Sequence, residues 1–277
     1  MPELPEVEAV RRRLAPAMTG ARFTRVTLRR PDLRSPFPRR FAARLTGRIV
    51  LALTRRAKYL VAELSSADTL LMHLGMSGSF RVERGRTNAG RPPRPPGTHD
   101  HVVFEMSTGA VVTFNDPRRF GFIGLLTPRQ LAAHRAMSTL GPEPLSDAFD
   151  ASSLALACKG RKTSLKAALL DQRVVAGLGN IYVVEALHRA GLSPLRRAST
   201  IATASGKPRP AAHRLAAAIK DVLVEAIERK RNPSYRTGRF RVYDRENEPC
   251  RTRGCGGRIQ RRTQGARSTF YCPRCQR

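Results

Sequence analysis

The 277-residue sequence has no tryptophan, and only 6% of its residues are aromatic. Acidic side chains are also scarce, since 21 Asp and Glu stand against 51 Lys and Arg. Long apolar runs are missing, and stretches such as residues 49–53 are too short to span a bilayer. We therefore expect no membrane span and no targeting segment. The lack of tryptophan and of a strongly amphipathic lysine-rich helix also argues against a membrane-surface protein.

The charge imbalance leaves a formal net charge of +30, far more than solubility requires. Such an excess indicates a polyanionic partner. Basic residues are spread along the chain and 41% of all residues are hydrophobic, which is typical of a folded protein with basic surfaces. The length of the chain suffices for two compact domains. From its charge and the lack of a targeting segment, we expect a cytoplasmic, nucleoid-associated protein.

Cysteine is rare as well, but four of the five cysteines lie near the end of the chain. Cys250 and Cys255 are separated by four residues, and Cys272 and Cys275 by two. This spacing is typical of two metal knuckles joined by a hairpin, and four thiolates suit one structural zinc ion. A disulfide pair is disfavoured in a reducing cytosol, and a thioredoxin-type motif would need a βαβ context. Arginines at 258, 261, 262 and 267 would make the finger a basic ribbon that fits a DNA groove.

The rest of the chain divides into a β-rich half and a helical half, which predicts an α+β protein. Short β-branched runs indicate an N-terminal β-sandwich or barrel behind a leading helix, with strands at 22–28, 49–53, 59–64, 70–73, 101–106, 110–114 and 122–126. Residues 84–97, rich in Arg, Pro and Gly, predict a surface loop. Helices are expected at 153–158, 164–170, 182–190 and 211–229. We assign residues 1–136 to the sandwich, 137–150 to a linker, 151–240 to a helical domain and 241–277 to a zinc finger.

The amino terminus carries a candidate nucleophile. Removal of Met1 would expose Pro2 as a free secondary amine, and a terminal amine has a pKa of about 8, well below that of lysine. Attack by this nitrogen on a sugar carbon gives an iminium that cannot relax to a neutral imine. Glu3 stands where an acid for the sugar ring oxygen is needed. The same residues also describe an ordinary amphipathic helix with Pro5 in its first turn.

Two glycine-containing turns carry apolar side chains that suit the opening of a base stack. Met76 lies in Leu74-Gly75-Met76-Ser77-Gly78, and Phe120 follows Arg118 and Arg119 in a second turn. Apolar wedges beside arginine can unstack a base step and fill the gap. Either residue alone would more often be a core residue at a strand end. In the helical half, Gly177-Leu178-Gly179-Asn180 opens a helix in a way that can accept a phosphate.

Together these motifs resemble the formamidopyrimidine-DNA glycosylase family over almost the whole chain. They are residues 2–8, 55–60, 72–78, 99–101, 115–121, 140–145, 177–182 and the terminal finger. The resemblance implies a monomeric base excision repair enzyme, both glycosylase and AP lyase, that acts on double-stranded DNA with oxidised purines or abasic sites. The implied fold is a β-sandwich, a helix-two-turn-helix domain and a β-hairpin zinc finger.

The resemblance also implies roles for single residues. Pro2 would attack C1′, Glu3 would protonate the opening sugar, Lys58 would serve β-elimination and Arg267 δ-elimination. Lys58 could equally grip a phosphate, and Arg267 could clamp the phosphates that flank the lesion. The DNA contacts would come from Glu6, Met76, His99, Arg118, Arg119, Phe120, Arg161, Lys166 and Asn180. Of these, Met76, Arg118 and Phe120 would fill the void left by the everted nucleotide, and Arg118 would donate to the orphaned cytosine.

Two stretches depart from the family pattern. The first knuckle is Cys250-x4-Cys255 where the family usually has two intervening residues, so the turn must bulge or Cys250 binds less well. Residues 230–238 lack the usual glycine- and threonine-rich sequence of the loop that covers the everted base. A weaker preference for 8-oxoguanine over other lesions is therefore our hypothesis.

Two other functions stay open on the sequence. An endonuclease VIII-like enzyme would share Pro2, Glu3, Lys58 and the finger but remove oxidised pyrimidines. A non-catalytic DNA-bending or lesion-sensing protein would keep the charge, the finger and the wedges and need no amine. The Met76 and Phe120 turns favour the purine enzyme, and the joint presence of the amine, acid and lysine argues against a pure binding protein.

Overall fold

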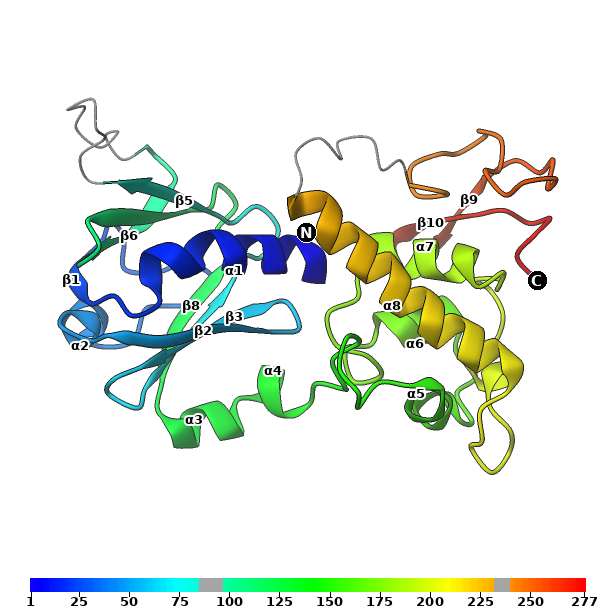
Figure 1. Ribbon diagram of the computed structural model, residues 1–277, viewed down its shortest axis with the longest axis horizontal. Helices are drawn as coiled ribbons and strands as arrows, with labels where there is room; N and C mark the ends of the chain where they lie inside the picture. The colour runs from blue at the N-terminus through cyan, green and yellow to red at the C-terminus, as the bar shows by residue number, and fades with distance from the viewer. Residues whose placement is uncertain (85–96, 232–239) are drawn as a thin grey trace. The chain divides into compact units, whose positions relative to one another are not determined.

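The computed structural model describes residues 1–84, 97–231 and 240–277 (Figure 1). Most of the expected loop at 84–97 and of the expected lid at 230–238 therefore lies outside the described residues. The chain forms two compact units, residues 1–138 and 139–277. No helix in the described ranges is long and apolar enough to cross a membrane.

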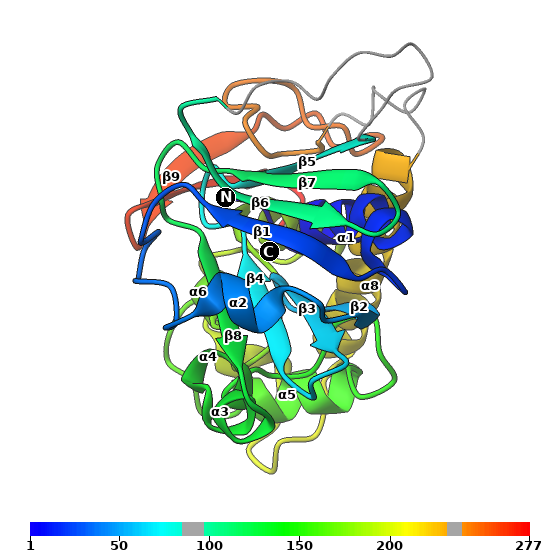
Figure 2. The ribbon, with the colours of Figure 1, turned by 90° about the vertical axis from the view of Figure 1, so that its left-hand side faces the viewer.

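The first unit is a β-sandwich with a leading helix, as predicted (Figure 2). Its two four-stranded sheets have the orders β1-β6-β7-β5 and β2-β3-β4-β8, and every pairing is antiparallel. The strands are β1 (Phe23–Leu28), β2 (Val50–Arg56), β3 (Tyr59–Leu64), β4 (Thr69–His73), β5 (Ser79–Arg84), β6 (Asp100–Met106), β7 (Ala110–Asn115) and β8 (Phe122–Leu126). Helix α1 (Leu4–Met18) packs against both sheets, and the short helices are α2 (Phe41–Leu45), α3 (Pro128–Ala133) and α4 (Arg135–Ser138).

The core of this unit follows from the alternation of apolar residues along each strand. Phe23 and Phe104 meet edge to face with ring centroids 5.4 Å apart, and both are fully buried. Helix α1 adds Val7 and Leu14, which share one face. The sequence missed β5, because Phe80 and Val82 alone give little signal and only the pairing with β7 makes the segment a strand.

The second unit combines the helices with the finger. Its elements are α5 (Ala151–Cys158), α6 (Leu165–Leu170), α7 (Asn180–Arg189), the 3₁₀ helix η1 (Ala198–Ile201), α8 (Pro210–Arg231) and the hairpin β9 (Gln260–Gln264) with β10 (Arg267–Tyr271). Asp150 and Ser164 cap α5 and α6 with side-chain oxygens. Cys158 of α5 is fully buried in the core.

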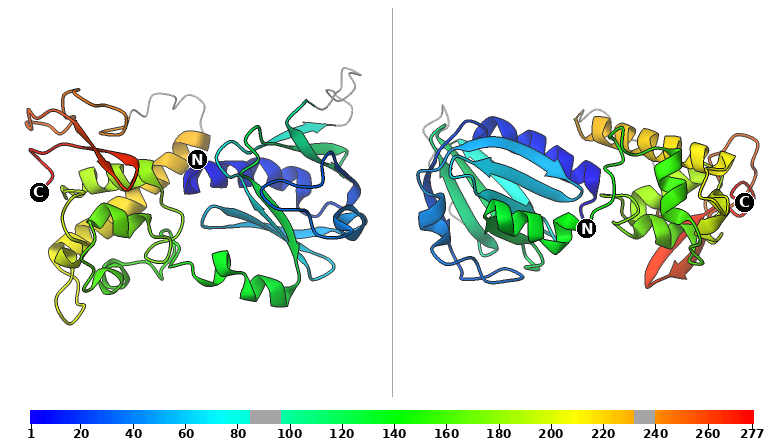
Figure 3. Two further views of the ribbon diagram at one scale, coloured as in Figure 1. Left: turned by 180° about the vertical axis from the view of Figure 1, so that it is seen from behind. Right: turned by 90° about the horizontal axis from the view of Figure 1, so that it is seen from below.

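The finger hairpin packs on the helices of the same unit, and Figure 3 shows it beside α7. Lys166 of α6 and Asn180 of α7 both donate to the Ser268 carbonyl, at 3.2 and 2.9 Å. Near the chain end, Gln276 Nε2 donates to the Leu192 carbonyl at 2.9 Å. The hairpin is thus fixed by hydrogen bonds to helices far away in the sequence.

Candidate active site and DNA interface

The amino end of α1 holds the predicted nucleophile and acid. Pro2 is partly exposed, whereas Glu3 is buried with 3% of its surface accessible. Glu3 is the N-cap of α1 and forms a capping box with Glu6, whose Oε2 accepts the Glu3 N–H at 2.9 Å. Glu6, predicted to contact DNA, therefore holds the helix start. The cap fixes the backbone directly after Pro2.

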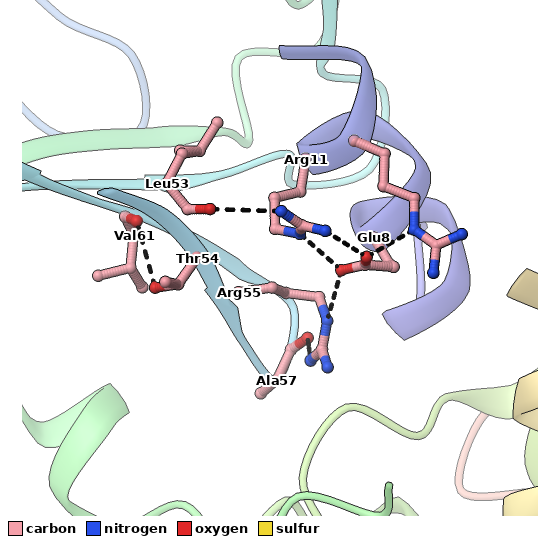
Figure 4. Close-up of polar contacts among 8 residues, drawn as sticks. Glu8, Arg11, Leu53, Thr54, Arg55, Ala57 and Val61 are labelled. Carbon is pink, nitrogen blue, oxygen red and sulfur yellow. Dashed lines mark hydrogen bonds and ion pairs between the residues drawn. The ribbon is translucent and has the colours of Figure 1, made fainter. Parts of the chain in front are cut away.

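Glu8, one turn further along α1, ties this helix to the lysine hairpin (Figure 4). Its carboxylate accepts from Arg11 and Arg12 at 2.8 Å and pairs with Arg55 Nε of β2 at 3.6 Å. Burial alone would raise the pKa of Glu8, but the bonds from Arg11 and Arg12 lower it below its ordinary value. Because the Glu8 carboxylate stays ionised, it keeps its ion pair with Arg55.

Arg55 also contacts the turn that carries Lys58. Its Nη1 donates to the Ala57 carbonyl at 2.9 Å (Figure 4), and Ala57 has a positive φ of 53°. Lys58 follows at the tip of the β2–β3 hairpin and is buried to 7% exposure. Nothing in the local sequence around Glu8 points to Arg55, its partner 47 residues away.

His73 packs beside this hairpin, where its ring lies 4.7 Å from that of Tyr59. Its Nδ1 accepts the Gly75 N–H at 3.0 Å. Burial, together with the charges of Lys58 and Arg34, lowers the pKa of His73 to about 4. The imidazole is therefore neutral near pH 7 and works as a hydrogen-bond acceptor.

The two predicted wedge residues are on the surface. Met76 and Phe120 are each 45% exposed, so the alternative that they belong to the core is wrong. The Arg118 guanidinium lies 4.8 Å from the centroid of the Phe120 ring, in cation–π contact. Arg118, Arg119 and His99 are exposed as well. An aromatic ring, a flexible thioether and cationic groups thus share this part of the sandwich surface.

Asp116 joins the two turns that carry these side chains. It is fully buried, and its two carboxylate oxygens accept from Ser77 Oγ and from the Gly121 N–H. Gly75 has φ +60°, and a Cβ there would collide with the backbone of Phe120. The close contact needs glycine at this position. The turns that carry Met76 and Phe120 are therefore held together by Asp116.

In the second unit, Asn180 is the first residue of α7. Its amide nitrogen bonds to Ser268, while its buried Oδ1 has no hydrogen-bond partner among the described residues. Gln172 shapes the preceding loop, because its Oε1 accepts the Gly177 N–H at 2.9 Å and its Nε2 donates to the Leu178 carbonyl. Sequence reasoning missed Gln172, since its partners are all main-chain atoms.

Arg161 and Arg267, two further predicted contacts, have different surroundings. Arg161 pairs with Asp171 at 3.0 Å, and the bonds from Arg173 and Arg161 lower the pKa of Asp171 to about 2. Arg267 stands exposed at the start of β10, directly after the hairpin turn. Arg267, which the sequence predicts to be catalytic, thus faces solvent.

Lys166 is buried to 1% exposure beneath the finger hairpin, and its Nζ donates to Thr269 Oγ1 at 2.7 Å. Burial and the nearby charge of Arg267 lower the pKa of Lys166 to about 8. Lys166 thus supports the hairpin, and its contact with DNA stays a prediction from the sequence.

The four finger cysteines converge as a metal site requires. All four sulfur atoms lie within 4.8 Å of one another, with 3.8 Å between Cys250 and Cys275 and 3.6 Å between Cys255 and Cys272. Tetrahedral zinc with Zn–S bonds of about 2.3 Å requires sulfur separations of roughly 3.8 Å. The residues therefore fit one zinc ion.

The longer first knuckle still brings Cys250 into this set, because the chain turns back at Gly254 with φ +73°. Burial alone would raise the pKa of the Cys250 thiol, but hydrogen bonds to Thr252 lower it to about 7. The turn thus accommodates the inserted residues and leaves Cys250 Sγ beside the other three sulfurs.

Glu185 of α7 is a further buried group that the sequence did not single out. Its carboxylate accepts the backbone N–H groups of Arg241, Val242 and Tyr243 at 2.8–2.9 Å. It anchors the segment that leads into the finger. A lone glutamate in an apolar helix is the only sequence signal, and it does not reveal the partner.

Three family models match the chain in the order of these parts. The formamidopyrimidine-DNA glycosylase N-terminal domain covers residues 1–123, its H2TH domain 140–236, and the zinc finger found in FPG and IleRS 247–277. The chain belongs to the formamidopyrimidine-DNA glycosylase family. The H2TH match confirms the helical domain expected from the resemblance, and the finger match agrees with the cysteine geometry.

Relatives and solved structures agree with this family. The formamidopyrimidine-DNA glycosylase of Afipia carboxidovorans is 58% identical, with both chains covered in full. The Lactococcus lactis enzyme, solved non-covalently bound to DNA containing an AP site, has a TM-score of 0.84 at 29% identity over the whole of both chains. A MutM structure in complex with DNA containing carbocyclic 8-oxo-G has a TM-score of 0.82 at 31% identity, again over the whole of both chains.

Proposed function

We propose that this chain is a bifunctional DNA glycosylase and AP lyase of base excision repair that removes oxidised purines, 8-oxoguanine and formamidopyrimidines. The observation that carries the proposal is the amino end of α1. There a partly exposed Pro2 precedes the buried Glu3, in a unit that also holds the tethered Lys58 hairpin. Family membership supports the same chemistry.

In the proposed reaction, the Pro2 nitrogen bonds to C1′ of the damaged nucleoside as the bond from C1′ to the base breaks. The base leaves with the electron pair of that bond and is neutralised by a proton, and the Pro2 nitrogen gives up its own proton. Glu3 supplies the proton to the sugar ring oxygen as the ring opens. The product is an iminium, which acidifies the C2′ proton. Loss of that proton expels the 3′ phosphate, assisted by Lys58, and a second elimination, assisted by Arg267, expels the 5′ phosphate. The chain needs no external oxidant or reductant for these steps.

The exposed residues of the sandwich would handle the everted nucleotide. Met76 and Phe120 would fill the gap in the stack, and Arg118, held over the Phe120 ring, would reach the orphaned cytosine. His99 and Arg119 lie exposed in the same unit and suit phosphates. In the second unit, Asn180 and Arg161 would bind phosphate beside the lesion, with Arg161 first released from Asp171.

The zinc ion would shape the finger so that its basic ribbon contacts DNA. The four cysteinates bind the ion, and the ion supplies folding energy and no catalytic step. We infer that the protein acts as a monomer, in the cytoplasm and at the nucleoid. We also propose residues 1–136, 151–240 and 241–277 as its functional parts, with 137–150 as linker.

Borohydride trapping tests the proposal. Duplexes carrying 8-oxoguanine, an oxidised pyrimidine or an abasic site are incubated with the full-length protein and sodium borohydride. A covalent adduct on the 8-oxoguanine and abasic duplexes supports the purine enzyme. An adduct preferentially on the pyrimidine duplex would assign the endonuclease VIII-like activity, and binding without any adduct would leave only a lesion-binding protein.

A matched pair of proteins locates the nucleophile. One carries two extra residues before Pro2, and the other is the chain with Met1 removed. We expect adduct from the second alone, with similar DNA affinity for both. The lid hypothesis is tested on the second protein: similar excision rates on 8-oxoguanine and formamidopyrimidine support it, and a strong 8-oxoguanine preference contradicts it.

A further inference from the structure

His188, in the last turn of α7, lies against the zinc cysteines. Its Nε2 is 3.4 Å from Cys250 Sγ and 3.8 Å from Cys275 Sγ, one sulfur from each knuckle. The imidazole is buried to 5% exposure. A histidine from the helical region therefore contacts the finger at the point where its two knuckles meet.

The two ring nitrogens of His188 have different surroundings. Nδ1 is buried with no hydrogen-bond partner among the described residues, whereas Nε2 faces the two sulfurs and Thr252 Oγ1. A zinc-bound thiolate only accepts hydrogen bonds. A neutral imidazole that donates a hydrogen bond to these sulfurs carries its proton on Nε2. The imidazolium also carries a proton on Nε2. The sulfurs thus receive an N–H in either state.

The sulfurs that His188 contacts are the more exposed pair. Cys250 and Cys275 are partly accessible, while Cys255 and Cys272 are buried. A cavity of about 390 Å³, lined by His188, Thr252 and Cys275 among others, opens on this side. Thr252 belongs to the residues that lengthen the first knuckle, and its hydroxyl is 3.9 Å from Cys275 Sγ. His188 therefore lies against the more exposed side of the metal site.

We propose that His188 donates its Nε2–H to the zinc-bound sulfurs of Cys250 and Cys275 and so retains the metal on its exposed side. A group that donates a hydrogen bond to a metal ligand orients that ligand and delocalises its negative charge, and loss of such a partner typically costs about 10- to 100-fold in metal affinity. His188 is a positioning residue and not a fifth ligand. The proposal does not depend on the glycosylase activity.

Zinc release from the full-length, zinc-loaded protein tests this role. Release into a chromophoric chelator is timed for the wild type, His188→Phe, His188→Gln and, as control, His213→Phe on an exposed site of α8. Phe fills the space without an N–H, and Gln keeps a donor. We expect release about 10- to 100-fold faster for His188→Phe, partial rescue by His188→Gln and no change for the control.

Two outcomes would overturn the proposal. Release from His188→Phe within twofold of wild type would show that the contact does nothing, and equal acceleration by Phe and Gln would assign the effect to packing. If His188→Phe does not fold, the decision passes to His188→Gln and to the cobalt-substituted wild type. Cobalt spectra of a four-thiolate site in the wild type support a hydrogen bond from His188 to the ligands, and a site with nitrogen ligation contradicts it.

Discussion

Lys166 Nζ of α6 donates a hydrogen bond to Thr269 Oγ1 of β10 at 2.7 Å. The two residues are 103 positions apart, and the contact joins the helical region to the finger hairpin. The same amine donates to the Ser268 carbonyl, one residue after Arg267. A lysine that looks like a DNA contact in the sequence thus helps to position the strand that presents Arg267.

The first prediction concerns this lysine. Lys166→Met removes the amine and both of its hydrogen bonds while keeping the apolar stem, so we expect the free energy of unfolding to fall by about 1–3 kcal/mol. Lys162→Met changes an exposed lysine nearby and should shift stability by no more than about 0.5 kcal/mol. Denaturant titration measures both. A large loss of DNA affinity by Lys166→Met at unchanged stability would instead assign it a direct DNA contact.

The second prediction concerns Glu8. Glu8→Gln weakens the ion pair with Arg55 and loosens the hairpin turn that carries Lys58. We expect strand cleavage at a preformed abasic site to slow on the order of 10-fold, because misplacement of a catalytic group is costly. Base release, which depends on Pro2 and Glu3, should slow less.

Glu105→Gln is the matched control, since the Glu105 side chain is 42% exposed and pairs with Arg25 only at 3.9 Å. It should leave both steps unchanged. Equal slowing of base release and strand cleavage by Glu8→Gln would mean that Glu8 supports the whole unit and not the lysine turn.

The third prediction concerns the wedges. Phe120→Ala and Met76→Ala remove exposed side chains, so stability should change by less than about 0.5 kcal/mol. Binding to lesion-containing duplex should weaken, by about 1–3 kcal/mol for Phe120, because stacking on a base is lost. Leu51→Ala, at another exposed apolar site of the sandwich, should leave binding unchanged. Normal affinity of Phe120→Ala for a lesion duplex would refute the wedge role.

The fourth prediction is a pH dependence from His73. Its pKa falls from an ordinary 6.5 to about 4 in the folded protein, so the unfolded chain binds the proton first. The stability that the neutral His73 provides is complete above pH 6.5 and is lost as the pH falls towards 4. Unfolding free energies at pH 7 and 5 measure the loss. His73→Gln should reduce the difference in the free energy of unfolding between pH 7 and pH 5. An unchanged difference would contradict the role assigned to His73.

Short-range patterns predicted much of this protein correctly. The period-two runs located the strands of the sandwich, since alternation along a strand decides which face is buried. The cysteine spacing predicted a zinc site, because ligand spacing within each knuckle is a local property. Helix ends were placed less well: α7 begins at Asn180, because the cap at Gly179 sets its start.

Long-range contacts decided the rest. The sequence established the charge, the candidate amine at Pro2, the lysine turn and the four thiolates, all of which depend on residues close together in the chain. Only the tertiary structure decided that Met76 and Phe120 are exposed, that Glu8 holds Arg55, and that Lys166 and His188 serve the finger. Those outcomes depend on hydrogen bonds and ion pairs between residues that are tens of positions apart. The order of residues along the chain does not show which buried polar groups will pair.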